Sequence, residues 1–465
     1  MKRLAIVYGE NISEIEKTAL GELSRILLDY TLEYPICKSC NSPDLSSYKC
    51  IYIGTKKSNS YIEKNSHAPL SHEEEYRICA ESEQIIIEGF DGAGVLYGVL
   101  DFYNKYMLKF EYTDNDKYWE NFLLNESFPE FEFTSYPSVK ERGLWTWSHV
   151  IYDILGYLDN MMRLKMNSVI IWCDHLPINA KEIVNHAHRR NIKVIWGYPW
   201  LWDTDCKKFD LTSLDGYPEK IFERYEREFR DAGGDGIYFQ TFTELHDDNI
   251  DGVAIADAAA KFVNKTVSLF YNKYPDIRLQ FGLHATSVKD RLTAIATVDP
   301  RVQIIWEDAG AFPFSYMPGD ISTFAETQDF AIKVARLRGN DDYFGAVTKG
   351  LVKLDWLSFL HPEGAHYMTG ASKELRENRL IRKRKIWKYV QAHWLANYGK
   401  ALEMVKLLCE TKGGALSVYA LVEDGLFEEE IFFPVALYSE MLWNTERDPK
   451  DIITEVAMRK YVTFA

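Results

Sequence analysis

Acidic and histidine side chains follow directly after apolar runs at several points of the sequence, and these residue types carry acid–base chemistry. Polar residues in such positions are Asp174, His175, Glu244, His284, Glu307, Asp308, Lys349 and Glu423. Burying an unpaired carboxylate is costly, so acidic residues directly after apolar strands are poor choices for packing. We therefore expect this set to line a site that acts on a ligand.

Three of these carboxyl groups suggest a reaction. Cleavage of a glycosidic bond needs one protonated carboxyl to donate to the departing oxygen, and a second that activates water or attacks the anomeric carbon. Glu244 is the candidate general acid, because its Thr and Phe neighbours make its setting less polar. Glu307 or Asp308 is then the base or nucleophile. For any one of the three, a salt bridge with Arg142 or Lys349 is the structural alternative.

Tryptophans gather at the same places. Of the 12 tryptophans, seven fall at or just beyond the ends of apolar runs, namely Trp145, Trp147, Trp172, Trp196, Trp200, Trp202 and Trp306. Aromatic faces stack on the C–H-rich faces of sugar rings, and indole N–H groups reach hydroxyls. This bias predicts an aromatic-lined cleft for a small oligosaccharide, with two or three of the seven filling the core instead.

The elements that must position these residues begin after Pro137, where eight apolar runs alternate with helical periodicity. The runs are Gly143–Trp147, Ser168–Trp172, Ile192–Trp196, Gly236–Thr241, Ile277–Gly282, Val302–Trp306, Phe344–Val347 and Ala415–Leu421. Apolar strands alternating with helices indicate a parallel sheet covered on both faces. Eight such units favour a closed (β/α)8 TIM barrel, with a doubly wound open sheet as the rival. Chemistry in such barrels lies at the carboxyl ends of the strands.

The spacing of apolar residues predicts two domains. Residues 1–135 predict a small α/β domain, and residues 136–465 predict the barrel, with a helical insertion near 373–410. We interpret the basic residues from Arg376 to Lys388 as a solvated helix surface. Glu440 and Trp443 are expected on a surface helix near the end of the chain.

Composition limits the function classes. The 465 residues hold 54 Lys and Arg against 69 Asp and Glu, a net charge of -15, and 46% are hydrophobic. This excludes global disorder and argues against nucleic-acid or anionic-membrane partners. No apolar run approaches the roughly 20 residues that span a bilayer, and the stretch from Met1 to Gly9 is too short for a signal peptide. We therefore expect a cytoplasmic protein; the oligomeric state stays open.

Seven cysteines, an odd number, fit a reducing compartment. Cys37-x-x-Cys40, with Cys50 and Cys79, lacks the second tight pair of a structural zinc site, so we expect ordinary thiols and neither a metal nor another cofactor.

A family resemblance rests on the following stretches of sequence. Tyr76–Ile78, Gln84–Gly89 and Asp91–Asp101 resemble the small N-terminal domain of hexosaminidase-like and α-glucuronidase-like glycoside hydrolases (families 20 and 67). Arg142-Gly143 and the turn Lys165-x-Asn167 look like the start of the barrel in the same group.

The resemblance implies an exo-acting hydrolase in which Arg142 grips hydroxyls or a carboxylate of the sugar. It also implies a catalytic acid at the end of strand four, which maps onto Glu244. Family 20 enzymes have Asp-Glu there, whereas Thr243 precedes Glu244 in this sequence. The α-glucuronidase-like pattern has an acid on strand four and carboxylates on later strands. Glu244 with Glu307 and Asp308 therefore fits this pattern better than it fits substrate-assisted cleavage.

Two other functions stay open. A metal-dependent barrel hydrolase would use His175, His246, His284 and Asp308. No His-x-His pair follows the first strand, where Trp145-Thr146-Trp147 stands. A non-catalytic carbohydrate-binding protein would keep the cleft without the reaction.

Overall fold

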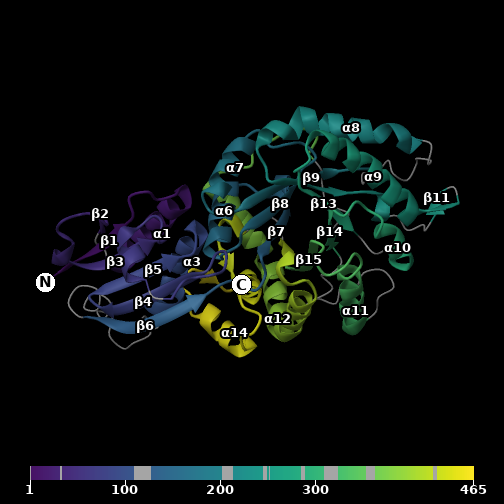
Figure 1. The fold of residues 1–465 in the computed structure, drawn as a ribbon. Coiled ribbons are helices and arrows are strands. Elements are labelled where there is room, and N and C mark those ends of the chain that lie inside the picture. Colours follow the sequence, from purple (N-terminus) through teal and green to yellow (C-terminus); the bar gives the residue numbers. More distant parts are fainter. Residues whose placement is uncertain are drawn as a thin grey trace. The chain divides into compact units, whose positions relative to one another are not determined.

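The computed structural model describes residues 2–31, 34–66, 68–108, 127–201, 213–244, 249–250, 252–283, 288–307, 323–351, 362–422 and 427–465. The chain divides into two compact units, residues 1–137 with 188–191, and residues 138–187 with 192–465. Figure 1 shows the first unit in purple and blue, and the second in teal to yellow.

The first unit is an α/β sheet domain. Its six strands have the order β2-β1-β3-β5-β4-β6. Asp91 begins α3 by accepting a hydrogen bond from the Gly94 N–H at 2.8 Å, so the Asp-Gly-Ala-Gly stretch is a helix cap. The strands are β1 (Arg3–Tyr8), β2 (Ile36–Ser39), β3 (Tyr48–Gly54), β4 (Tyr76–Ser82), β5 (Gln84–Gly89) and β6 (Phe128–Ser135), and the helices are α1 (Glu14–Thr31), α2 (Ser60–Asn65) and α3 (Gly92–Asp101).

The second unit is a closed barrel of eight parallel strands, so the predicted TIM barrel is confirmed. The first strand, β7, pairs with the last, β16, as well as with β8. Every predicted run corresponds to a strand, although most bounds shift. The strands are β7 (Glu141–Trp147), β8 (Ser168–Trp172), β9 (Lys193–Pro199), β10 (Gly236–Gln240), β13 (Leu279–Leu283), β14 (Gln303–Trp306), β15 (Phe344–Leu351) and β16 (Leu416–Val422).

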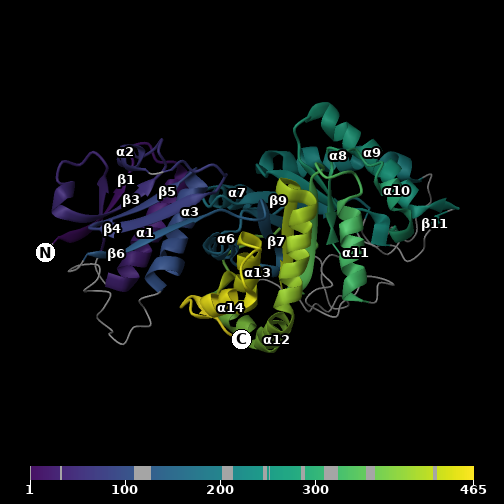
Figure 2. The same ribbon diagram turned by 60° about the horizontal axis from the view of Figure 1, so that its bottom comes forward.

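Helices surround the barrel in both views (Figures 1 and 2). They are α6 (Ile154–Arg163), α7 (Ala180–His188), α8 (Tyr217–Arg224), α9 (Ile255–Lys273), α10 (Leu292–Ile295), α11 (Phe324–Ala335), α12 (Lys373–Lys412), α13 (Phe433–Trp443) and α14 (Pro449–Ala457). Within the described residues, no helix combines the length and apolar character needed to cross a membrane.

Helix α12 is the longest of these, with 40 residues, and stands upright in Figure 2. At 1.5 Å per residue it is about 60 Å long. The Trp394 indole N–H donates to the Gly350 carbonyl at 2.8 Å. Gly350 lies next to the carboxyl end of β15, so the half of α12 before Trp394 extends beyond that end of the strand. Its basic residues are not all solvated as expected, because Arg376 and Arg379 form ion pairs with Glu429 and Glu428.

The Arg142-Gly143 and Lys165-x-Asn167 motifs form one structural unit at the amino-terminal end of the barrel. The Arg142 guanidinium donates to the Lys165 carbonyl at 2.9 Å and to the Val139 carbonyl at 2.8 Å, and Asn167 accepts from the Arg142 backbone N–H at 2.8 Å. A side chain on Gly143 would lie 1.7 Å from the Ser168 carbonyl oxygen, so glycine lets β7 and β8 approach. These motifs therefore maintain the fold.

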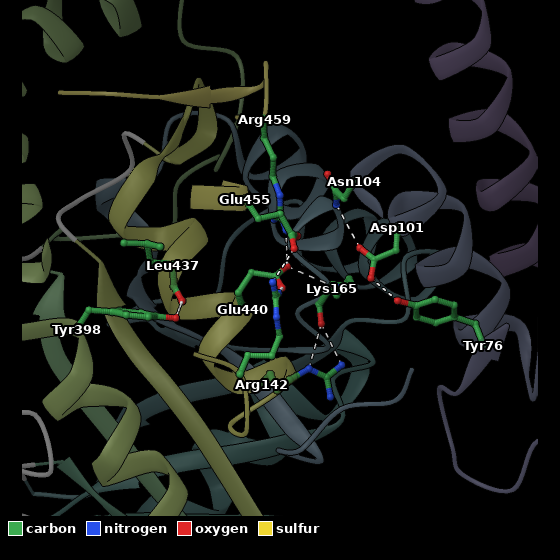
Figure 3. A network of polar contacts seen from close by, with 11 residues as sticks. Tyr76, Asp101, Asn104, Arg142, Lys165, Tyr398, Leu437, Glu440, Glu455 and Arg459 are labelled. Atoms are coloured by element: carbon green, nitrogen blue, oxygen red, sulfur yellow. Dashed lines mark hydrogen bonds and ion pairs between the residues drawn. The ribbon is translucent and has the colours of Figure 1, made fainter. Parts of the chain in front are cut away.

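Figure 3 shows Glu440 at the centre of a charge network that includes Lys165 of the second motif. Its carboxylate lies 2.9 Å from Arg459 and 3.5 Å from Lys165, and all three side chains are buried. Lys165 also lies over the Trp443 ring, 4.2 Å from its centroid. The expectation that Glu440 and Trp443 lie on a surface helix is therefore wrong. The sequence places α13 correctly but does not show that this helix is buried all round.

Candidate active site

The carboxyl end of the barrel has an inward-facing layer of large aromatic side chains. Trp145, Trp147, Trp172 and Tyr238 belong to one buried cluster inside the barrel. The Trp145 and Trp147 rings meet edge to face at 4.7 Å, and Tyr238 lies edge-on to Trp145 at 6.0 Å. These side chains form an apolar floor below the carboxyl-end opening of the barrel, which we call the mouth.

Glu307 lies at the same end, immediately after β14. Side chains alternate along a strand, and Ile305 faces the interior, so Glu307 faces the interior too. The residue is buried, with 5% of its surface exposed. Gln240, at the end of β10, donates a hydrogen bond from Nε2 to Glu307 Oε1. The structure therefore holds a buried carboxyl group at the mouth.

Gly282 on β13 provides the space for this carboxyl group. It pairs with Gln240 on one side and with Ile305 on the other. A Cβ atom at this position would lie 2.3 Å from Glu307 Oε1 and 2.0 Å from the Tyr238 hydroxyl oxygen. Any larger residue would displace one or both groups.

Three of the predicted cleft tryptophans lie on the outer side of their strands and pack against the helices. Trp200 stacks on Phe239 at 3.7 Å and lies 5.3 Å from Phe270 of α9. Trp306 lies 5.1 Å from Phe330 of α11. Trp196 directly follows the inward-facing Ile195 in β9, so its side chain faces outward. The expectation that Trp200 and Trp306 bind substrate therefore does not fit their positions. Both lie in the core between sheet and helices.

Arg142 also lies away from the mouth. Its guanidinium donates to backbone carbonyls at the amino-terminal end of the barrel, and only 1% of the residue is exposed. The role in gripping a sugar that the resemblance implied does not fit this position. In this structure the Arg-Gly pair anchors the first strand.

Asp174 and His175 follow β8 at the carboxyl end and are partly exposed. Arg224 donates to the Asp174 backbone carbonyl, which fixes the chain just past the strand. Both residues stay candidates for contact with substrate.

The other predicted site residues are described in part or not at all. Glu244 ends a short 3-10 helix, Phe242–Glu244, that follows β10, and its side chain lies outside the described part. Lys349 lies in β15, and its side chain is likewise outside that part. Trp202, His284, Asp308 and Glu423 lie outside the described residues, as does His246 of the metal-dependent alternative. The pairing of Glu244 with Glu307 or Asp308 therefore stays a prediction.

A second buried carboxyl group, Glu428, was missed by the sequence reasoning. It accepts hydrogen bonds from the backbone N–H groups of Tyr152 and Asp153, each at 2.7 Å, and lies 3.7 Å from Arg379 of α12. Burial raises the pKa of Glu428 to about 7, even though these donors favour the charged form. Glu428 holds the loop after β7 against α12, and no local sequence signal marks it.

Gln240, Tyr238 and Gly282 were also missed. Gln240 ends an otherwise apolar strand, two positions after the inward-facing Tyr238. Once the inward face of the strand is known, this spacing indicates that Gln240 faces the site.

No protein-family model and no curated protein matches the sequence. Solved structures match its fold. The β-N-acetylhexosaminidase from Bacteroides fragilis NCTC 9343 has a TM-score of 0.54 and 14% identity, covering 96% of this chain and 88% of that one. CpGH84B has a TM-score of 0.54 and 12% identity, covering 98% of this chain and 70% of that one.

The 4-O-methyl-α-glucuronidase BtGH115A has a TM-score of 0.52 and 13% identity, covering 95% of this chain but 56% of that one. The chain thus spans little more than half of this last protein. At these identities the likeness shows the fold. The resemblance to the hexosaminidase-like and α-glucuronidase-like group is confirmed at that level, as a TIM barrel with a separate N-terminal sheet domain.

Proposed function

We propose that the protein is a glycoside hydrolase that removes a terminal sugar from a short oligosaccharide by carboxylate acid–base catalysis. The observation that carries this proposal is Glu307, a buried carboxyl group above an aromatic floor at the carboxyl end of the barrel. Active sites of TIM-barrel enzymes lie at this end. The matching solved structures include a hexosaminidase and an α-glucuronidase, which supports a carbohydrate substrate.

In this mechanism Glu244 donates a proton to the glycosidic oxygen as the bond to the anomeric carbon breaks. Glu307 or Asp308 accepts a proton from the attacking water or bonds to the anomeric carbon itself. The aromatic layer of Trp147 and Trp172 stacks against the pyranose ring. Exo action follows from the resemblance to enzymes that release terminal sugars.

The test is hydrolysis of aryl glycosides and of short glucuronic-acid-bearing xylo-oligosaccharides, from about pH 4 to 8. We expect Glu244→Gln to lower turnover on a natural glycoside by about 100-fold or more. A substrate with a good leaving group should lose less, because it needs less protonation. Wild-type rates in Glu244→Gln would refute its role as the acid.

Two other outcomes would contradict the proposal. Saccharide binding without turnover at any pH would indicate a carbohydrate-binding protein. Hydrolysis that is lost on chelation and restored by a stoichiometric metal would indicate the metal-dependent alternative.

A further inference from the structure

The interior of the barrel holds three glutamines whose surroundings differ. Gln280 and Gln303 lie toward the amino-terminal end, where the Gln280 amide donates to Gln303 at 2.8 Å and Gln303 donates to Ser417 at 3.0 Å. Gln240 lies at the mouth and donates to the buried carboxyl group of Glu307. Among the site residues that the structure describes, Glu307 is the one contacted by a glutamine of this set, and that glutamine is Gln240.

The side-chain amide of Gln240 is fixed in one orientation. Its Nε2 atom donates both to Glu307 Oε1 and to the Tyr238 hydroxyl, the latter at 3.3 Å. An amide nitrogen has two hydrogens, so both contacts can form together. Tyr238 is rigid because it is fully buried among the interior aromatics. The amide nitrogen, and not the amide oxygen, is therefore presented to the carboxyl group.

An N–H donor on a carboxyl oxygen favours the charged form of that carboxyl group. Burial has the opposite effect, because a buried carboxylate without a donor is costly. A glutamine suits this task because it donates without taking up or losing a proton itself. A base or nucleophile must be ionised before it reacts, whereas a general acid must be protonated.

Resting on the proposed function, we propose that Gln240 is a positioning residue that holds Glu307 ionised and aimed into the mouth. This makes Glu307, rather than Asp308, the base or nucleophile. Gly282 completes the arrangement, because a Cβ atom there would lie 2.3 Å from the same carboxylate oxygen.

Within the described residues, the titratable side chain near Glu307 is Tyr238 on β10. Lys349 on β15 lies two positions beyond the inward-facing Val347, and Glu244, His284 and Asp308 follow strand ends, with side chains outside the described part.

The test compares Gln240→Met, which keeps the length and removes the donor, with Gln280→Met as a matched control. Both are buried glutamines on neighbouring strands. In Gln240→Met we expect the acidic limb of the pH profile of kcat/KM to move up by about one pH unit. In Gln280→Met the acidic limb of the kcat/KM profile should lie at the same pH as in the wild type.

A second measurement does not require turnover. The carboxyl carbon of Glu307 is titrated by 13C NMR in labelled protein, with Glu307→Gln assigning the signal. We expect the Glu307 pKa to be about one unit higher in Gln240→Met than in the wild type. Equal values in the two proteins would overturn the role of Gln240. A wild type that hydrolyses no glycoside would overturn the proposed function instead, and the NMR titration would still decide this inference.

Discussion

Each end of the barrel interior holds a buried carboxyl group, and the described donors to the two groups differ. At the amino-terminal end, Glu141 accepts from Arg278 at 2.7 and 2.6 Å, and Ser417 donates to it at 2.9 Å. At the carboxyl end, Glu307 is held by an uncharged amide above an aromatic floor. Glu141 is tied to a guanidinium of the opposite charge, whereas Gln240 orients Glu307 with an amide that neither takes up nor loses a proton.

The largest expected effect is on stability and concerns the amino-terminal end. Glu440→Ala removes a buried carboxylate from Lys165 and Arg459, and Arg459 keeps Glu455 at 2.8 Å. Removing one partner of a buried ion pair costs about 3 to 5 kcal/mol, so we expect the free energy of unfolding to fall by that amount. Urea unfolding measures it, and kcat of the folded enzyme serves as control. A loss of kcat without a loss of stability would break the comparison.

Two buried carboxyl groups predict opposite dependences of stability on pH. Burial alone raises the pKa of Glu141, but the Arg278 guanidinium outweighs burial and lowers it to about 2. Its contribution is present above pH 4.5 and is lost as the pH falls toward 2. Burial raises the pKa of Glu428 to about 7, so its contribution is present below pH 4.5 and is lost as the pH rises through 7.

Glu428→Gln should therefore remove a decline in stability of the order of 3 kcal/mol between pH 4.5 and 7. Denaturant unfolding of both proteins at several pH values measures this. Parallel curves for the variant and the wild type would show that Glu428 does not titrate in this range.

Gly282→Ala should separate catalysis from stability at the carboxyl end. The added methyl group would lie 2.3 Å from Glu307 Oε1, and a displacement of about 1 Å at a reacting group lowers turnover by about 100-fold. Gly345→Ala is the control, because its methyl group would meet the Ile305 Cδ1 atom, the end of a flexible side chain, at 2.3 Å. Equal kcat values in the two variants would exclude a special role for Gly282.

The smallest expected effect distinguishes inward from outward tryptophans. Trp147→Ala should raise KM by about 10-fold through lost stacking. Trp200→Phe keeps the stack on Phe239 outside the barrel and should leave KM unchanged. Steady-state kinetics on one aryl glycoside tests both. A larger change in KM in Trp200→Phe than in Trp147→Ala would contradict the assignment of Trp147 to the inner face and Trp200 to the outer face of the barrel.

The sequence was sufficient for the fold because each barrel strand is a short apolar run, such as the fully buried Ser168–Trp172. It was insufficient for the site, because adjacent residues on a strand face opposite sides and only strand register shows which side is inward. Trp306 and Glu307 are neighbours, yet one packs on α11 and the other faces the mouth. Arg142 was misplaced for a related reason, since β7 carries it at the end opposite to Trp147.

Closure of the barrel has a consequence for synthesis of the protein. The first strand, β7, completes its pairing only with the last, β16, and the backbone N–H groups of Ser138 and Val139 bond to carbonyls of Trp443 and Leu442. A nascent chain on the ribosome therefore exposes one unpaired edge of β7 until β16 has emerged. Exposed edges invite pairing with other chains, so we expect truncations that remove β16 to aggregate and to depend on chaperones.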